Sequence, residues 1–244
     1  MTKKYKNPPI IESICAFQFL SKEAQDFIFV GQFYEKIKEE FPLRQQKLGV
    51  DLLLRNKDES RISHEFEFHF PIIQFFNQNK NFVIQLGNNL LTINYLKPYA
   101  SWEEFKDKIF QIIEKYNTIS NTNLIQKITL RYLNQININD NENLADYLLL
   151  YPNIPQNINL DKKNFNLYVE FKDKEFENNI IKVNLHTLKD ETTNIISVLL
   201  DIDFTLSFNS SSMNELSSIL DKMHFEIENI FELCLTEKCK TLFN

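Results

Sequence analysis

The chain has 244 residues, of which 43% are hydrophobic and 25% are charged, so it holds enough apolar side chains to bury a large core. Its net charge of −6 leaves no excess of basic groups to neutralise phosphates, which argues against nucleic-acid binding. With only three glycines, the sequence also excludes the glycine-rich loops that hold nucleotide phosphates and the glycine-flanked turn that presents a nucleophilic serine.

The first half of the chain predicts a strand, a short helix, three strands and a second helix. Apolar residues at helical spacing indicate the helices, and alternation of apolar and polar residues indicates the strands. The turn Gly87-Asn88-Asn89 joins the last two strands, and Ser101 with Glu104 forms a capping box for the second helix. The predicted strands cover residues 14–20, 63–70, 81–86 and 90–96, and the predicted helices cover residues 33–41 and 101–116.

The second half of the chain predicts the same order of elements and ends in a long helix. Ser212 and Glu215 form a capping box at the start of this helix, and Ile219 and Phe231 widen its apolar seam beyond one face. The seam residues are Leu216, Leu220, Met223, Ile227, Ile230 and Cys234. The predicted strands cover residues 127–136, 165–171, 180–188 and 195–208, and a short helix at 143–150 ends before Pro152.

Both halves therefore follow the order βαβββα, and the predicted fold class is α+β, with antiparallel sheet or sheets that carry helices on one face. We expect residues 1–244 to form a single compact domain. Residues 12–120 and 127–237 are then possible pseudo-repeats, although no residue-level identity links them. The alternative is a chance coincidence among short antiparallel elements.

The sequence favours a cytoplasmic protein. No apolar run approaches the roughly 20 residues that a membrane-spanning helix needs, and no apolar signal segment follows Met1. Cys15, Cys234 and Cys239 are odd in number and are not spaced as CxxC pairs. Neither a disulfide framework nor a zinc site is indicated, so we expect three reduced thiols.

Four short motifs occur in a fixed order along the chain. They are Tyr5-x-Asn7-Pro8-Pro9-Ile10-x-Glu12, Trp102-Glu103, Arg131-Tyr132-Leu133-Asn134 and Leu200-Asp201-Ile202-Asp203. Together they resemble a sporadically distributed family of conserved hypothetical proteins of bacteria and archaea, with Leu133 where that family would have Ile. The resemblance covers nearly the whole chain. It implies no assigned enzymatic activity, and it implies a place among genes of mobile or antiviral defence-associated loci.

Asp201 and Asp203 lie two residues apart on a predicted strand, so both carboxylates share one face. Such a pair could hold a divalent cation or serve as an acid and a base. The favoured alternative is structural pairing with a basic group on a neighbouring strand. Arg131 is the natural partner, and we predict a contact between Arg131 and Asp203 that ties the two halves together.

The other polar clusters favour structural roles. Glu65, Glu67 and His69 share one face of a predicted strand, and a solvent-exposed face explains this stripe better than a set of metal ligands does. His186 and His224 are more typical of hydrogen-bonded or solvated side chains than of catalytic ones, and no cysteine has a base beside it in sequence. We therefore predict no metal, no cofactor and no catalytic residue.

Two functions of different classes follow. The many aromatic residues and the long seamed helix favour a non-catalytic protein-interaction component that works with a partner gene product or with a second copy of itself. Its predicted interface residues are Tyr5, Ile10, Ile219 and Phe231. The alternative is a small-molecule-binding protein with a pocket between the two halves. The predicted ligand residues are Arg131, Tyr132, Asn134 and Asp203.

Overall fold

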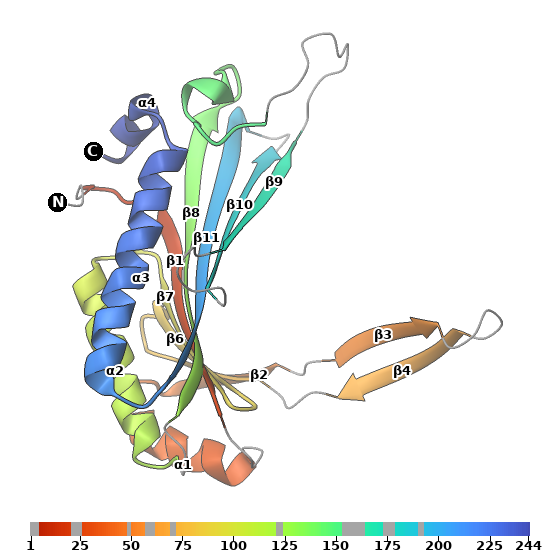
Figure 1. Cartoon of the computed structure of the whole chain (residues 1–244), viewed down its shortest axis with the longest axis vertical. Coiled ribbons are helices and arrows are strands. Elements are labelled where there is room, and N and C mark those ends of the chain that lie inside the picture. The colour runs from red at the N-terminus through yellow and green to blue at the C-terminus, as the bar shows by residue number, and fades with distance from the viewer. Residues whose placement is uncertain are drawn as a thin grey trace.

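The computed structural model shows the α+β fold that the sequence predicts, with one large antiparallel sheet that carries helices along one of its faces (Figure 1). It describes residues 5–20, 26–47, 50–56, 62–68, 72–120, 124–152, 164–172, 179–189 and 193–244. The side chains of residues 47–71 and of Lys189 lie outside this description. In the described ranges, no helix has the length and apolar character needed to cross a membrane.

Nine strands form the large sheet in the order β2-β5-β6-β7-β1-β8-β11-β10-β9, and β3 and β4 pair separately as a two-stranded sheet. The strands are β1 (Ile10–Phe19), β2 (Leu43–Lys47), β3 (Val50–Asn56), β4 (Ile62–Phe68), β5 (Ile72–Phe76), β6 (Phe82–Gly87), β7 (Leu90–Leu96), β8 (Ile125–Asn139), β9 (Asn166–Lys172), β10 (Ile180–Lys189) and β11 (Ile195–Ser210). The helices are α1 (Phe27–Ile37), α2 (Trp102–Asn117), α3 (Met213–Cys234) and α4 (Glu237–Lys240), with 3-10 turns η1 (Leu144–Asp146) and η2 (Thr241–Phe243).

Strands β1 and β8 lie side by side at the centre of the sheet. Outward from this pair, the first half continues through β7, β6 and β5, and the second half continues through β11, β10 and β9. The first half also contains α1, β2 and the β3–β4 pair, whereas between β8 and β9 the described residues of the second half, 140–152 and 164–165, contain only the turn η1. That residues 12–120 and 127–237 are repeats of one another stays a prediction.

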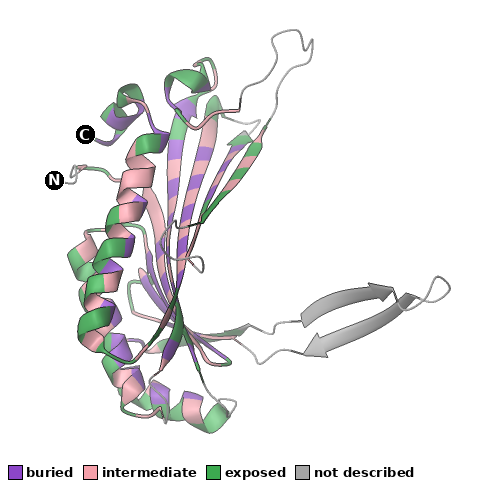
Figure 2. Cartoon of the chain, in the orientation of Figure 1, coloured by how far each residue is buried: buried purple, intermediate pink, exposed green. Residues whose placement is uncertain are grey.

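Alternation along the central strands gives the sheet two chemically different faces. On β8, Leu130 and Tyr132 are buried, whereas their neighbour Arg131 points to the other side of the strand. We call the side covered by α2 and α3 the helix face and the other side the opposite face. Figure 2 shows the buried residues along the strands and along the inner sides of the helices.

Helix α3 lies along the helix face because one stripe of its surface is apolar. Its hydroxyl cap forms as the sequence predicts, with the Ser212 side chain accepting a hydrogen bond from the amide of Glu215. The buried stripe consists of Leu216, Leu220, Met223, Ile227 and Cys234. The seam therefore packs against the sheet of its own chain.

The segment predicted as a helix at residues 143–150 contains only the single turn η1. The carbonyl of Tyr147 accepts from the amide of Thr236, and the amide of Leu149 donates to the carbonyl of Cys234 at 2.8 Å. These backbone groups pair with the end of α3 and the residues after it, so they are not available to continue a helix.

The segment before β1 is held in place by backbone hydrogen bonds at both of its ends. The amide of Asn7 donates to the carbonyl of Phe243 at 2.9 Å, and the carbonyl of Pro9 accepts from the amide of Gln135 at 2.8 Å. Between these bonds, Pro8 and Pro9 keep the backbone extended. The segment consequently runs past α3 into β1, and the C-terminal end lies on the helix side of the sheet (Figure 1).

Candidate ligand-binding pocket

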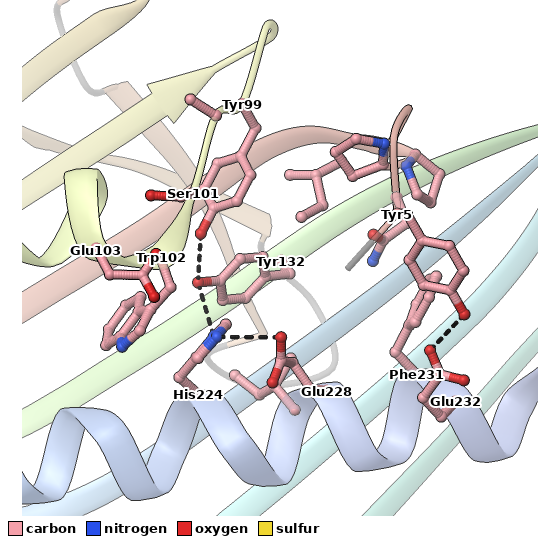
Figure 3. Close-up of a pocket in the computed structure, with 16 residues that line it drawn as sticks. Tyr5, Tyr99, Ser101, Trp102, Glu103, Tyr132, His224, Glu228, Phe231 and Glu232 are labelled. Carbon is pink, nitrogen blue, oxygen red and sulfur yellow. Dashed lines mark hydrogen bonds and ion pairs between the residues drawn. The ribbon is translucent and has the colours of Figure 1, made fainter. Parts of the chain in front are cut away.

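A cavity of about 210 Å³ lies between the segment before β1, the start of α2, strand β8 and helix α3 (Figure 3). Its aromatic lining residues are Tyr5, Tyr99, Trp102, Tyr132 and Phe231, and its acidic ones are Glu103, Glu228 and Glu232. The other apolar lining residues are Pro8, Pro9, Ile10, Ala100 and Ile227. The remaining polar lining residues are Ser101, Asn134 and His224. No lysine or arginine is among these described lining residues.

A line of four hydrogen-bonding groups runs along the pocket wall. The hydroxyl of Tyr99 lies 3.2 Å from that of Tyr132, which lies 3.1 Å from Nδ1 of His224. The Nε2 atom of His224 lies 3.2 Å from a carboxylate oxygen of Glu228, one helical turn further along α3. Burial raises the pKa of both tyrosine hydroxyls, so they stay protonated at neutral pH.

Trp102 forms the wall on the α2 side. Its indole stacks on the ring of His224, with 4.4 Å between the ring centroids and 13° between the ring planes. Its Nε1–H donates to Asp221 at 2.9 Å, and Lys106 forms an ion pair with the other oxygen of the same carboxylate at 2.6 Å. The indole is thus fixed in orientation by two contacts to α3, and Lys106 of α2 holds the carboxylate that accepts its N–H.

Tyr5 closes the other end of the pocket. Its hydroxyl donates to Glu232 at 2.6 Å, and its ring packs edge-to-face against Phe231 and Phe243. Burial and the hydrogen bond to Glu232 raise the pKa of the Tyr5 hydroxyl. Lys240 lies 3.0 Å from the second oxygen of Glu232, so this carboxylate is held from both sides.

Of the four ligand residues predicted from the sequence, only Tyr132 and Asn134 line the pocket. Arg131 and Asp203 lie on the opposite face of the sheet, so the predicted convergence of all four is wrong. The reason is the two-residue period of a strand, which sends Arg131 and Tyr132 to different sides of β8. Asn134 is buried and donates from its amide nitrogen to the carbonyl of Leu200 at 3.1 Å.

On the opposite face, Arg131 pairs with a different aspartate from the one predicted. It forms a bidentate contact with the carboxylate of Asp201. Its Nε donates to one oxygen at 2.7 Å, and a terminal nitrogen donates to the other oxygen at 2.5 Å. Asp203 is the residue directly across from Arg131 in the strand register, but its carboxylate accepts from the hydroxyl of Thr205 at 3.0 Å. The guanidinium therefore reaches diagonally along β11. Arg131 and Asp201 both lie within residues 127–237, so the contact joins two strands of the second half and does not tie the two halves together as predicted.

The predicted interface residues lie in two places. Tyr5, Ile10 and Phe231 line the pocket, and Ile219 is partly buried against the hydrophobic core. Their role in an interface stays a prediction.

Several lining residues were not predicted from the sequence, above all Tyr99, Glu228 and Glu232. A signal for the two glutamates exists in the helix pattern, because His224, Glu228 and Glu232 follow one another at four-residue intervals and so share one stripe of α3. Tyr99 precedes the capping box of α2 and carries no pattern of its own.

The other predicted site residues give no assembled centre. Among the described residues, no group of three or more His, Cys, Asp and Glu side chains is arranged to hold a metal. The stripe of Glu65, Glu67 and His69 lies outside the described side chains, so the structure does not test it. The absence of a bound metal stays a prediction, which elemental analysis of the purified chain tests. His186 lies on β10, away from the pocket lining.

Comparisons of this chain with protein-family models, with curated proteins and with solved structures found no match. Membership of the family that the sequence resembles therefore stays a prediction.

Proposed function

We propose that the protein binds a small organic molecule in the pocket between the segment before β1, the start of α2, strand β8 and helix α3. One observation carries this proposal. Three of the four sequence motifs that are far apart in the chain supply neighbouring walls of the same cavity, through Pro8-Pro9-Ile10, Trp102-Glu103 and Tyr132-x-Asn134.

The character of the walls supports the proposal. Binding sites for small molecules are concave and mostly apolar, with a few polar groups fixed in orientation. Here the aromatic and proline side chains supply the apolar part, while Tyr132 and His224 are held by partners from other elements. A ligand would therefore meet a largely preformed site and would lose little affinity to ordering of the protein.

A protein-interaction role loses its main support from the sequence. That support was the long seam of α3, which packs against the sheet of its own chain. An interaction role through another surface stays a prediction, and so does the absence of catalysis. We propose a defence-associated locus because of the family resemblance noted above. We propose a cytoplasmic location because the three cysteines are free, as is usual in a reducing compartment.

The test uses the single tryptophan of the chain, because Trp102 lines the pocket and no second tryptophan contributes to the emission. A small-molecule library screened against tryptophan fluorescence should yield compounds that shift the emission and that compete with one another. The variant Ala100→Phe adds a ring at an exposed lining position and should abolish these shifts.

The matched control is Ala145→Phe, which makes the same substitution at an exposed alanine on η1 that does not line the pocket. This variant should keep the response of the unsubstituted protein. If hits bind equally well to both variants, or if a broad library gives no hit, the pocket is not a binding site for small molecules.

A further inference from the structure

The first relevant feature of the pocket is the sign of its charge. Glu103, Glu228 and Glu232 line it, and Lys240, which pairs with Glu232 outside the lining, also pairs with Glu237. An anionic ligand would bring a further negative charge to a half-buried wall, where Coulomb interactions are stronger than in bulk water. The charges of the wall favour a cationic ligand.

The second feature is the supply of hydrogen-bond donors. Nε2 of His224 faces the Glu228 carboxylate, which can only accept. In the neutral tautomer that carries its proton on Nε2, Nδ1 then accepts from Tyr132, and the oxygen of Tyr132 is left to accept from Tyr99. The hydroxyl proton of Tyr5 is donated to Glu232. Among the described lining side chains, the Ser101 hydroxyl and the second N–H of Asn134 remain as donors. The other polar groups left to meet a ligand are carboxylate oxygens and hydroxyl lone pairs, so the ligand has to supply most of the donors.

The third feature is the aromatic wall. Five aromatic side chains surround a cavity of about 210 Å³, and the faces of aromatic rings attract cations. The cavity is smaller than the common range for drug-sized ligands, roughly 300–1,000 Å³. It suits a compact molecule with one charged head and an apolar body.

One feature opposes a cation, namely the positive N-terminal end of α2, which begins at Trp102 beside the pocket. The N-cap and two acidic side chains of the first turn offset it. The side chain of Ser101 accepts from the amide of Glu104, and the carboxylates of Glu103 and Glu104 lie in the same turn. The helix end is therefore capped and surrounded by negative charge.

We propose that the ligand of this pocket is a small organic cation with N–H donors, meaning a primary ammonium or a guanidinium group on an apolar body of about six carbons. This inference rests on the function proposed above and adds the class of ligand. Glu228 is the principal partner of the charged head, because it lies at the centre of the wall between His224 and Glu232 along α3 (Figure 3).

The experiment compares probes that share one apolar body, with Trp102 emission and calorimetry as the two readouts. The probes are hexylamine, hexylguanidine, hexan-1-ol, hexanoate and hexyltrimethylammonium. Hexylamine or hexylguanidine should bind at least about tenfold more tightly than the alcohol and the trimethylammonium compound, because charge-assisted hydrogen bonds need both the charge and the N–H groups. Hexanoate should bind most weakly.

Two variants locate the partner of the charged head. Glu228→Gln should weaken hexylamine about tenfold and leave hexan-1-ol unchanged, since only the cation loses a charge-assisted bond. Glu103→Gln serves as a second variant if the first one unfolds. The control is Glu226→Gln, which makes the same change in net charge on α3 at a residue that does not line the pocket.

The outcomes separate the two proposals. If the alcohol, the carboxylate or the trimethylammonium compound binds as tightly as the amines, the inference about ligand class is wrong while the pocket remains a binding site. If none of the five probes binds, the inference is also overturned, and the library screen alone then decides the proposed function. A tenfold loss that Glu226→Gln reproduces would show a general charge effect and would overturn the role of Glu228.

Discussion

The guanidinium of Arg131 joins two strands on the opposite face of the sheet and does so from a partly exposed position. Its side chain is 40% exposed, whereas that of Asp201 is only 13% exposed. The carboxylate is therefore the more buried member of the pair. Loss of the arginine would leave it without a counter-charge, in a place where water reaches it poorly.

We expect Arg131→Ala to lower the free energy of unfolding by about 1–2 kcal/mol, which is less than for a fully buried pair because solvent screens the exposed guanidinium. Urea denaturation at neutral pH measures this loss. Lys127→Ala is the control, since Lys127 is an exposed cation on the same strand. A loss no larger than that of the control would show that the pair contributes nothing to stability.

Asp203 gives a prediction that depends on pH. Burial raises the pKa of its carboxyl above the ordinary value, with Arg131 and Lys182 opposing the shift. A carboxyl whose pKa is raised in the folded state stabilises the fold most when it is protonated, at pH values below its unfolded-state pKa of about 4. This contribution to the free energy of unfolding is lost as the pH rises through the folded-state pKa. Asp203→Asn should therefore be more stable than the unsubstituted protein at pH 7.

The difference should shrink as the pH falls below about 4, where both proteins are neutral at this position. Thermal unfolding of both proteins across this pH range is the measurement. A variant that is less stable at pH 7, or a difference that does not change with pH, would contradict this account of Asp203.

At the scale of elements, α3 is the helix on which both the core and the pocket depend. One stripe of it supplies buried apolar residues, and the adjacent stripe supplies His224, Glu228 and Glu232 to the pocket. Phe231 lies at the border between them and is partly buried in the core. Any change that rotates α3 would therefore disturb the core and the pocket together.

We expect Ile219→Gln to lower the free energy of unfolding by about 1–2 kcal/mol, because it places an amide against apolar neighbours. Leu233→Gln should change it by less than about 0.5 kcal/mol, since Leu233 is 74% exposed. Urea denaturation measures both variants, and size-exclusion chromatography measures their mass in solution. A folded Ile219→Gln variant with a changed mass would instead support an interface at this position.

The sequence predicts α2 and α3 well because capping boxes and apolar spacing are local signals. It misses β2, β3 and β5 and wrongly predicts a helix at residues 143–150, because these segments depend on strand pairing and on hydrogen bonds to the chain end. The separation of Arg131 from Tyr132 could have been predicted from alternation alone. The meeting of Tyr5 with Glu232 could not, since nothing in one sequence says which distant segments pack together.

At the scale of the whole molecule, the three free cysteines are buried, so their reactivity measures local opening of the fold. Cys15 and Cys239 are 0% exposed and Cys234 is 7% exposed. Burial raises the pKa of all three thiols, to about 11 for Cys234 and about 12 for Cys239. The reactive thiolate form is therefore scarce in the folded protein at neutral pH.

We expect a thiol reagent such as Ellman's reagent to label the native protein far more slowly than the urea-unfolded protein, which should yield three thiols per chain. Labelling of Cys15 should be the slowest, because its strand lies at the centre of the sheet. Absorbance kinetics and peptide mapping measure the rates. Fast labelling of any thiol under native conditions would show local opening at that site.

The contact between Tyr5 and Glu232 joins residues that are 227 positions apart. During synthesis, the first wall of the pocket leaves the ribosome long before the residues of α3 that complete it. The central strand β1 must likewise wait for β8, whose residues lie more than a hundred positions later. Because contacts between distant segments form late and slowly, the ligand pocket should be among the last parts of the molecule to appear, and a nascent chain should have no binding activity until α3 has docked.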